Sequence, residues 1–217
     1  MMGMRWLAFG DANTNSGGGV RTYVDLARAE AIKLCLASID VYGDREWTSL
    51  DLLRAIAQCR GPIGADGADL VSIMIGTFDH AIDPGQSKPR VTLDQFRENM
   101  REVLLTVRGW ERLGRRSDGG PTIIVLTPPF CMTGVNKAGV QFSQERLSEY
   151  SSALLELAAE QNVIPVDINT IFAGSVRRSD DRLKRVWTEQ GDGITLNSIA
   201  HKLIYPFIRG ALKACVQ

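Results

Sequence analysis

Five short runs of apolar residues alternate along the chain with longer segments in which apolar residues recur every three or four positions. Short runs that are almost wholly apolar are typical of strands buried on both faces of a sheet, and the longer spacing is typical of amphipathic helices. The runs predict strands over residues 4–10, 38–42, 69–75, 122–126 and 163–167. The periodic segments predict helices over residues 23–37, 50–56, 93–113, 143–161 and 197–213.

This alternation predicts a three-layer α/β/α sandwich with a five-stranded parallel sheet, formed as a single domain over residues 1–217. Thr92 stands where it can cap the third helix, and Pro206 is expected to kink the last one. The charged segment 177–185 is expected to be a solvated loop or a short helix.

The amino-acid composition argues against several classes of function. The 217 residues carry 25 basic and 25 acidic side chains, and this zero net charge argues against a nucleic-acid partner. No apolar run is long enough for a transmembrane helix, and the start of the chain is too short in apolar residues for a signal peptide. The four cysteines are widely spaced, so we interpret them as reduced thiols of a cytoplasmic protein. We expect a small-molecule ligand and neither a metal nor another cofactor.

Ligands of open parallel sheets bind beyond the carboxyl ends of the strands. Here those ends carry residues 11–12, 43–47, 76–80, 127–129 and 191–195. A Gly-Asp turn leaving the first strand is a good place for a nucleophile. The next residue, however, is Ala12, whose methyl group can neither attack nor form a hydrogen bond.

Four segments, in order along the chain, resemble the motif blocks of the SGNH hydrolases, also called the GDSL esterase/lipase family. Residues 10–14 read Gly-Asp-Ala-Asn-Thr, similar to Gly-Asp-Ser-x-Thr, and residues 43–53 resemble a Gly-x-x-Gly turn with the start of a helix. Residues 69–79 end in Gly-Thr-Phe-Asp, similar to Gly-x-Asn-Asp. Residues 192–201 resemble Asp-Gly-x-His-Leu-Asn followed by Gly-His. The resemblance implies the flavodoxin-like architecture of that family.

The catalytic residues that the resemblance implies are largely replaced. Its nucleophilic serine falls on Ala12, its oxyanion-hole glycine and asparagine on Glu46 and Phe78, and its histidine base on Thr195, whereas the aspartate that orients the base is present as Asp192. Acyl transfer of this kind needs a hydroxyl, a base within hydrogen-bond reach and donors aimed at the oxyanion. The sequence therefore predicts that ester hydrolysis has been lost.

The residues now at these positions suggest another chemistry. If Glu46 and Asp192 face one cleft, desolvation and like charge would raise the pKa of one carboxyl and create an acid/base pair, with Asp11 as a further candidate. Such a pair suits cyclisation, elimination or isomerisation of a small, mostly apolar molecule. The residues expected to bind this substrate are Ala12, Asn13, Trp47, Thr77, Phe78, Asp79, His80 and Thr195.

Structural roles remain open for the same residues. Asp11 can satisfy turn amides, Glu46 can face solvent, Asp192 can be a turn residue, Phe78 can fill a collapsed site and His80 can be an exposed loop residue. Two other functions also stay open. One is a catalytically inactive relative that binds a ligand or a protein partner, and the other is a residual esterase with a non-standard nucleophile such as Ser16 or Thr14.

Overall fold

The fold was analysed in a computed structural model, which describes residues 3–15, 19–58, 67–110, 120–176, 187–188 and 192–215. Five parallel strands form the central sheet in the order β2-β1-β3-β4-β7, which confirms the predicted sheet. The strands are β1 (Met4–Gly10), β2 (Leu36–Gly43), β3 (Leu70–Met74), β4 (Thr122–Leu126) and β7 (Ile164–Val166). The edge strand β7 is short, and its Pro165 stands opposite Val125 of β4.

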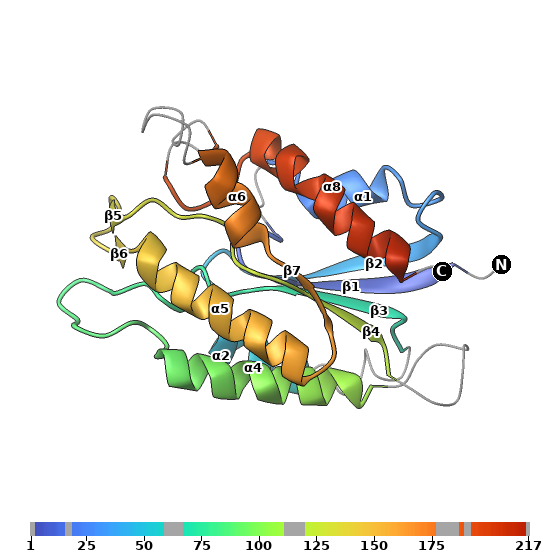
Figure 1. The fold of residues 1–217 in the computed structure, drawn as a ribbon, viewed down its shortest axis with the longest axis horizontal. Coiled ribbons are helices and arrows are strands. Elements are labelled where there is room, and N and C mark those ends of the chain that lie inside the picture. Colours follow the sequence, from blue (N-terminus) through green and yellow to red (C-terminus); the bar gives the residue numbers. More distant parts are fainter. Residues whose placement is uncertain are drawn as a thin grey trace.

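Helices cover both faces of this sheet (Figure 1). One face packs against α2 (Ser49–Gln58), α4 (Leu93–Arg108) and α5 (Gln144–Glu160), and the other against α1 (Tyr23–Arg28), α6 (Ile168–Val176) and α8 (Ser198–Ala214). Successive strand residues point to opposite faces, so Leu7 and Phe9 of β1 join the first core and Trp6 and Ala8 join the second. Because both faces are covered, the central strands are mostly apolar.

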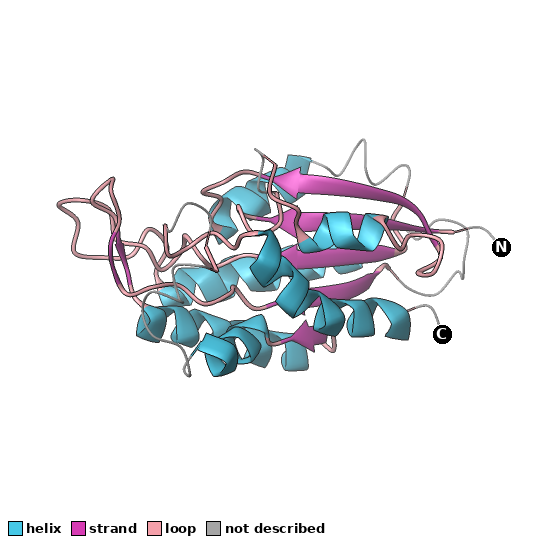
Figure 2. Cartoon of the chain, turned by 90° about the horizontal axis from the view of Figure 1, so that it is seen from above, coloured by secondary structure: helices cyan, strands magenta, loops and turns pink. Residues whose placement is uncertain are grey.

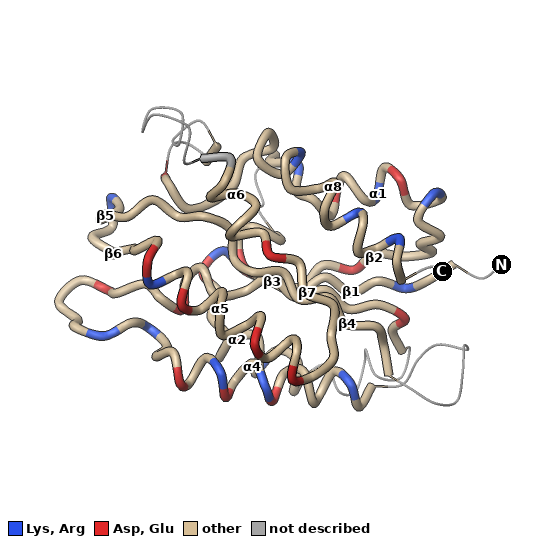
Figure 3. The backbone as a smooth tube through the Cα atoms, viewed as in Figure 1, with Lys and Arg blue, Asp and Glu red and all other residues tan. Residues whose placement is uncertain are grey.

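Local hydrogen bonds explain where the longer helices begin. Thr92 accepts a hydrogen bond from the Gln95 amide while the Gln95 side chain accepts one from the Thr92 amide, which is a capping box. Ser143 and Asn197 cap α5 and α8 in the same position. Basic and acidic residues alternate along α4 (Figure 3), and two of its arginines pair with Glu156 and Glu160 of α5.

The structure corrects several predicted boundaries. The helix predicted over 23–37 ends at Arg28, because residues 29–35 form turns and Cys35 adopts a left-handed conformation (φ 52°) before β2 begins. The helix predicted over 93–113 ends at Arg108. Helix α6 was not predicted, and neither was the hairpin of β5 (Gly134–Val135) and β6 (Gln141–Phe142). The predicted element over 177–185 lies outside the described residues.

All five strands end at the same edge of the sheet, on the side where the small β5–β6 hairpin projects (Figure 2). At this edge Gly10 of β1 stands opposite Gly43 of β2. A side chain at either position would overlap the neighbouring backbone, since a Cβ on Gly43 would meet the Gly10 carbonyl oxygen. Gly43 therefore allows β2 to approach β1 closely where the candidate site begins, and Gly10 allows β1 to approach the Met74 carbonyl of β3 and the Thr14 side chain.

The close approach at this edge makes a prediction about stability. Gly43→Ala is expected to lower the free energy of unfolding by about 2 kcal/mol, because the added methyl group forces the two strand ends apart. For a chain of this size that lowers the melting temperature by about 5 °C, which calorimetry can measure. Gly210→Ala is the control: Gly210 lies inside α8 with open space around it, so this variant should be stabilised by about 0.5–1 kcal/mol. Equal melting temperatures for wild type and Gly43→Ala would contradict the interpretation.

Candidate functional site

Four hydrogen bonds bring the four motif segments together at the carboxyl ends of the strands. The first segment reaches the second through the Ala12 amide, which donates to the Arg45 carbonyl (3.3 Å). The second reaches the third through the Ser49 amide, which donates to Asp79 Oδ1 (2.8 Å). Asn13 links the first segment to the third through Thr77 and to the fourth through Leu196. Segments separated by up to 183 residues thus form one site.

Asn13 is the residue that joins most of these segments. Its side-chain oxygen accepts a hydrogen bond from the Leu196 amide (2.8 Å), and its Nδ2 donates to Thr77 Oγ1 (3.4 Å). Its own amide donates to Asp11 Oδ1 (2.9 Å). Asn13, Thr77 and Asp11 are completely buried. Both ends of the Asn13 amide group are therefore engaged within the fold, and its predicted contact with a substrate stays a prediction.

Ala12 lies in a closed apolar cluster. Its exposed fraction is 1% and that of Phe78 is 7%, and Thr195 is also buried. The cluster consists of Ala12, Phe78, Ala81, Cys131, Val140, Phe142, Leu147 and Ile194. The ring of Phe78 meets that of Phe142 edge-on, with 6.0 Å between their centroids. Phe78 thus fills space beside Ala12.

An arginine that the sequence analysis did not single out covers this cluster. The Arg90 guanidinium lies 5.8 Å from the centroid of the Phe78 ring, donates to Asp83 Oδ1 (2.8 Å) and donates to Glu46 Oε2 (2.9 Å). The Glu46 side chain is 65% exposed, so the interpretation that it faces solvent is confirmed. Arg90 is separated from Glu46 by 44 positions, and no sequence pattern indicated this contact.

Asp192 has different partners from Glu46. Its Oδ1 accepts hydrogen bonds from the amides of Ile194 (2.8 Å) and Thr195 (3.0 Å), which confirms the interpretation as a turn residue. Trp47 is partly buried against the core under α2 and α4, whereas Phe78 belongs to the cluster around Ala12. The predicted acid/base pair of Glu46 and Asp192 stays a prediction that these contacts do not support.

Two fully buried carboxyl groups lie under the site instead. Burial raises the pKa of Asp11 from 3.8 to about 6 and that of Asp79 from 3.8 to about 7, and the charge of Asp11 adds to the increase for Asp79. Asp11 Oδ1 accepts from Asn13 and Asp79 Oδ1 accepts from Ser49, but neither Oδ2 atom has a hydrogen-bond partner among the described residues. In each carboxyl group the Oδ2 atom is therefore the oxygen that can carry a proton near neutral pH.

His80 and Cys131 form a neutral contact beside these carboxyl groups. His80 Nε2 lies 3.5 Å from Cys131 Sγ, and both residues are fully buried, so the interpretation of His80 as an exposed loop residue is wrong. Burial lowers the pKa of His80 to about 4 and raises that of Cys131 to about 12. An uncharged thiol beside an uncharged imidazole is a poor nucleophile. Cys131 follows the end of β4 closely in the sequence. This was the one feature of the sequence that indicated a position at this edge of the sheet.

Among the described residues, no group of three or more His, Cys, Asp and Glu side chains is placed to hold a metal ion. No helix within the described ranges combines the length and the apolar character needed to cross a membrane.

Comparison with solved structures agrees with the architecture. A catalytic mutant of Axe2, an acetylxylan esterase from Geobacillus stearothermophilus, superposes with a TM-score of 0.73 at 18% identity, covering 97% of this chain and 94% of that one. The lipase/acylhydrolase from Enterococcus faecalis gives a TM-score of 0.68 at 21% identity, with 97% and 96% covered. LAE5, an alpha/beta hydrolase enzyme from the metagenome of Lake Arreo, gives 0.66 at 20% identity, with 100% and 97% covered.

These likenesses establish the fold, and the family follows from the sequence. No curated protein matches the chain significantly. The family model described as GDSL-like Lipase/Acylhydrolase matches residues 8–202, which include all four motif segments. The chain therefore belongs to the GDSL-like lipase/acylhydrolase family.

Proposed function

We propose that this chain is a member of its family that does not hydrolyse esters and that acts by binding a ligand or a partner. The observation that carries the proposal is the closed cluster around Ala12. A methyl group stands where the motif has a nucleophilic hydroxyl, and the Ala12 amide is already bonded to the Arg45 carbonyl. Neither the nucleophile nor this backbone donor is available to an ester.

The expected loss of catalytic turnover is large enough to support this proposal. Removing one member of a serine-protease triad costs up to about a million-fold in turnover, and removing an oxyanion donor costs about a hundred- to a thousand-fold. Position 12 offers no hydroxyl and position 195 offers no imidazole. Phe78 and the Arg90 contact above it further separate Ala12 from solvent.

Hydrolysis of a short-chain nitrophenyl ester tests the proposal. Wild-type protein is expected to release nitrophenol no faster than a buffer blank. The double variant Ala12→Ser/Thr195→His restores a hydroxyl and a base in the motif positions and is expected to exceed wild type, whereas Ala12→Ser alone is expected to stay near the blank.

Rapid hydrolysis by wild type would contradict the proposal. If Ser16→Ala then abolished this activity, the residual esterase would be the right interpretation. Ser16 lies outside the described residues, so only this measurement assigns it a role.

A second candidate function is supported by the buried carboxyl groups. Asp11 and Asp79 have pKa values raised to about 6 and about 7, which is the range in which a carboxyl group can both release and take up a proton at neutral pH. They lie beside an apolar wall that includes Phe78. In this second candidate function, the chain performs a non-hydrolytic cyclisation, elimination or isomerisation, and Asp11 and Asp79 are the acid/base groups.

The titration of Asp79 predicts a pH dependence of stability. Its pKa is about 7 in the folded protein and 3.8 is the ordinary value, so between these pH values the folded state keeps a proton that the unfolded chain has lost. The free energy of unfolding is therefore expected to fall as the pH rises from about 4 to about 7, by at most about 1.4 kcal/mol per pH unit for this proton.

Asp79→Asn should make this slope shallower and leave the contribution of Asp11, because an amide keeps the acceptor for Ser49 and does not titrate. Asp94→Asn, an exposed change at the start of α4, should leave the slope as in wild type. Urea unfolding at a series of pH values gives the comparison. Parallel curves for wild type and Asp79→Asn would show that Asp79 does not hold its proton near neutrality.

Catalysis itself requires a separate measurement. Incubation of the protein with a small-molecule extract in D₂O, followed by mass spectrometry, is expected on the second candidate to yield isomers of a consumed compound, or products that carry deuterium. Asp11→Asn should abolish these products and the exposed change Glu149→Gln should not. Conversion that is unaffected by Asp11→Asn, Asp79→Asn, Glu46→Gln and Asp192→Asn would reject acid/base catalysis by these carboxyl groups.

A further inference from the structure

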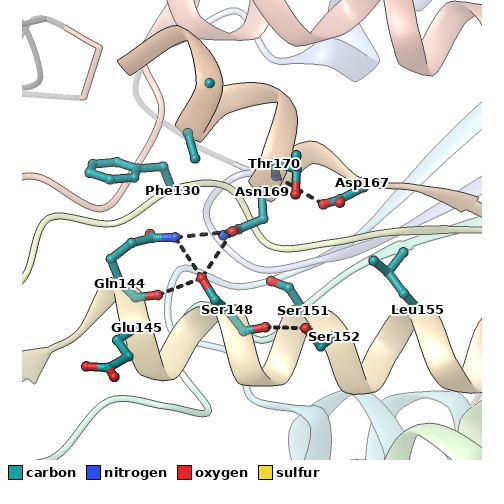
Figure 4. A pocket seen from close by; sticks show the side chains of 12 residues that line it. Phe130, Gln144, Glu145, Ser148, Ser151, Ser152, Leu155, Asp167, Asn169 and Thr170 are labelled. Atoms are coloured by element: carbon teal, nitrogen blue, oxygen red, sulfur yellow. Dashed lines mark hydrogen bonds between the residues drawn. The ribbon is translucent and has the colours of Figure 1, made fainter. Parts of the chain in front are cut away.

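A groove separate from the Ala12 cluster lies between α5 and α6, at the carboxyl end of β7 (Figure 4). Its volume is about 560 Å³, within the range of sites that hold small molecules. None of its lining residues belongs to the apolar cluster around Ala12. The groove runs from Phe130 at one end to Leu155 at the other.

A hydrogen-bond network holds the two walls of the groove in place. Gln144 of α5 donates from Nε2 to Asn169 Oδ1 of α6 (3.1 Å) and to Ser148 Oγ (3.2 Å). The Asn169 side chain also donates to the Pro128 carbonyl (3.3 Å). Asn169 is buried, so this link between the helices is sheltered from water. The groove is therefore formed before any ligand arrives.

Its polar surface consists mainly of hydrogen-bond acceptors. Ser151 and Ser152 donate their hydroxyl protons to the carbonyls four positions earlier in α5, at 3.0 and 2.9 Å. Ser148 does the same at 2.9 Å, and one of its lone pairs already accepts from Gln144 Nε2. A hydroxyl whose proton is used in this way offers its lone pairs to a neighbour. Nε2 of Gln144, the amide nitrogen of that side chain, is likewise occupied. A ligand with donor groups matches this surface better than one with acceptors.

The charged residues among the described lining of the groove are both negative. Asp167, which follows β7 directly, uses Oδ1 to accept from Thr127 Oγ1 and the Thr170 amide, and its Oδ2 forms no hydrogen bond to a described residue. Glu145 is the other charged residue of the lining, and no Lys or Arg is present among the described residues that line the groove. Phe130 adds an aromatic surface, which attracts cations.

We propose that this groove is a binding site for a small organic cation that carries one or more ammonium groups, such as an aliphatic diamine. The ammonium protons would meet the serine oxygens and the Asp167 carboxylate, and the methylene groups would lie against Phe130 and Leu155. The site goes beyond the proposed function, because its residues are independent of Ala12 and the ester test does not involve them.

Titration calorimetry at low ionic strength tests the proposal with putrescine and with butanediol, its uncharged counterpart of similar length. The full chain is expected to bind putrescine and not butanediol. Asp167→Asn, which keeps the acceptor for Thr127 and Thr170, is expected to weaken putrescine binding about tenfold by removing the charge. Ser152→Lys places a positive charge on the exposed rim and is expected to weaken it at least as much.

Glu149→Gln is the matched control, since it removes one negative charge from an exposed position of α5 outside the groove and is expected to leave the affinity unchanged. Circular dichroism verifies that each variant is folded. Equal binding of butanediol and putrescine would overturn the charge selectivity. No binding of putrescine at millimolar concentration, or equal weakening by Glu149→Gln and Asp167→Asn, would overturn the site.

Discussion

The buried amide of Asn13 is the interaction on which the geometry of this edge of the sheet depends. One side chain connects the turn after β1 with the loop after β3 and with the segment before α8. A buried amide left without partners is costly, so the three segments are coupled: displacing one exposes unsatisfied groups in the others. This coupling holds the motif segments together beside the apolar cluster that contains Ala12.

The same burial determines the electrostatics beneath the site. Asp11, Asp79, His80 and Cys131 are all removed from water, and for each of them the uncharged form is favoured. A hydrolytic site instead needs a charge that can form and be stabilised. These buried side chains near Ala12 thus form an interior in which charge is disfavoured.

Much of the fold was predictable from the sequence because the strands are apolar on both faces and the long helices are amphipathic. The strand over Thr122–Leu126 was predicted to the residue. Helix α6 was missed because it is short and is separated from β7 only by Asp167, which accepts a hydrogen bond from the Thr170 amide. The contacts of Arg90 were not predictable, since ion pairs between distant loops leave no periodic pattern.

The two edges of the sheet differ in what they offer to another polypeptide. At β7 the middle residue of three is Pro165, which has no amide proton, so a strand added there would lose a ladder hydrogen bond. Strand β2 has eight residues and, within the described chain, pairs on one side only. Self-association of concentrated protein by sheet extension would therefore begin along β2, and the charged Asp40 in the middle of that strand, held by Arg5 of β1, is the feature that opposes it.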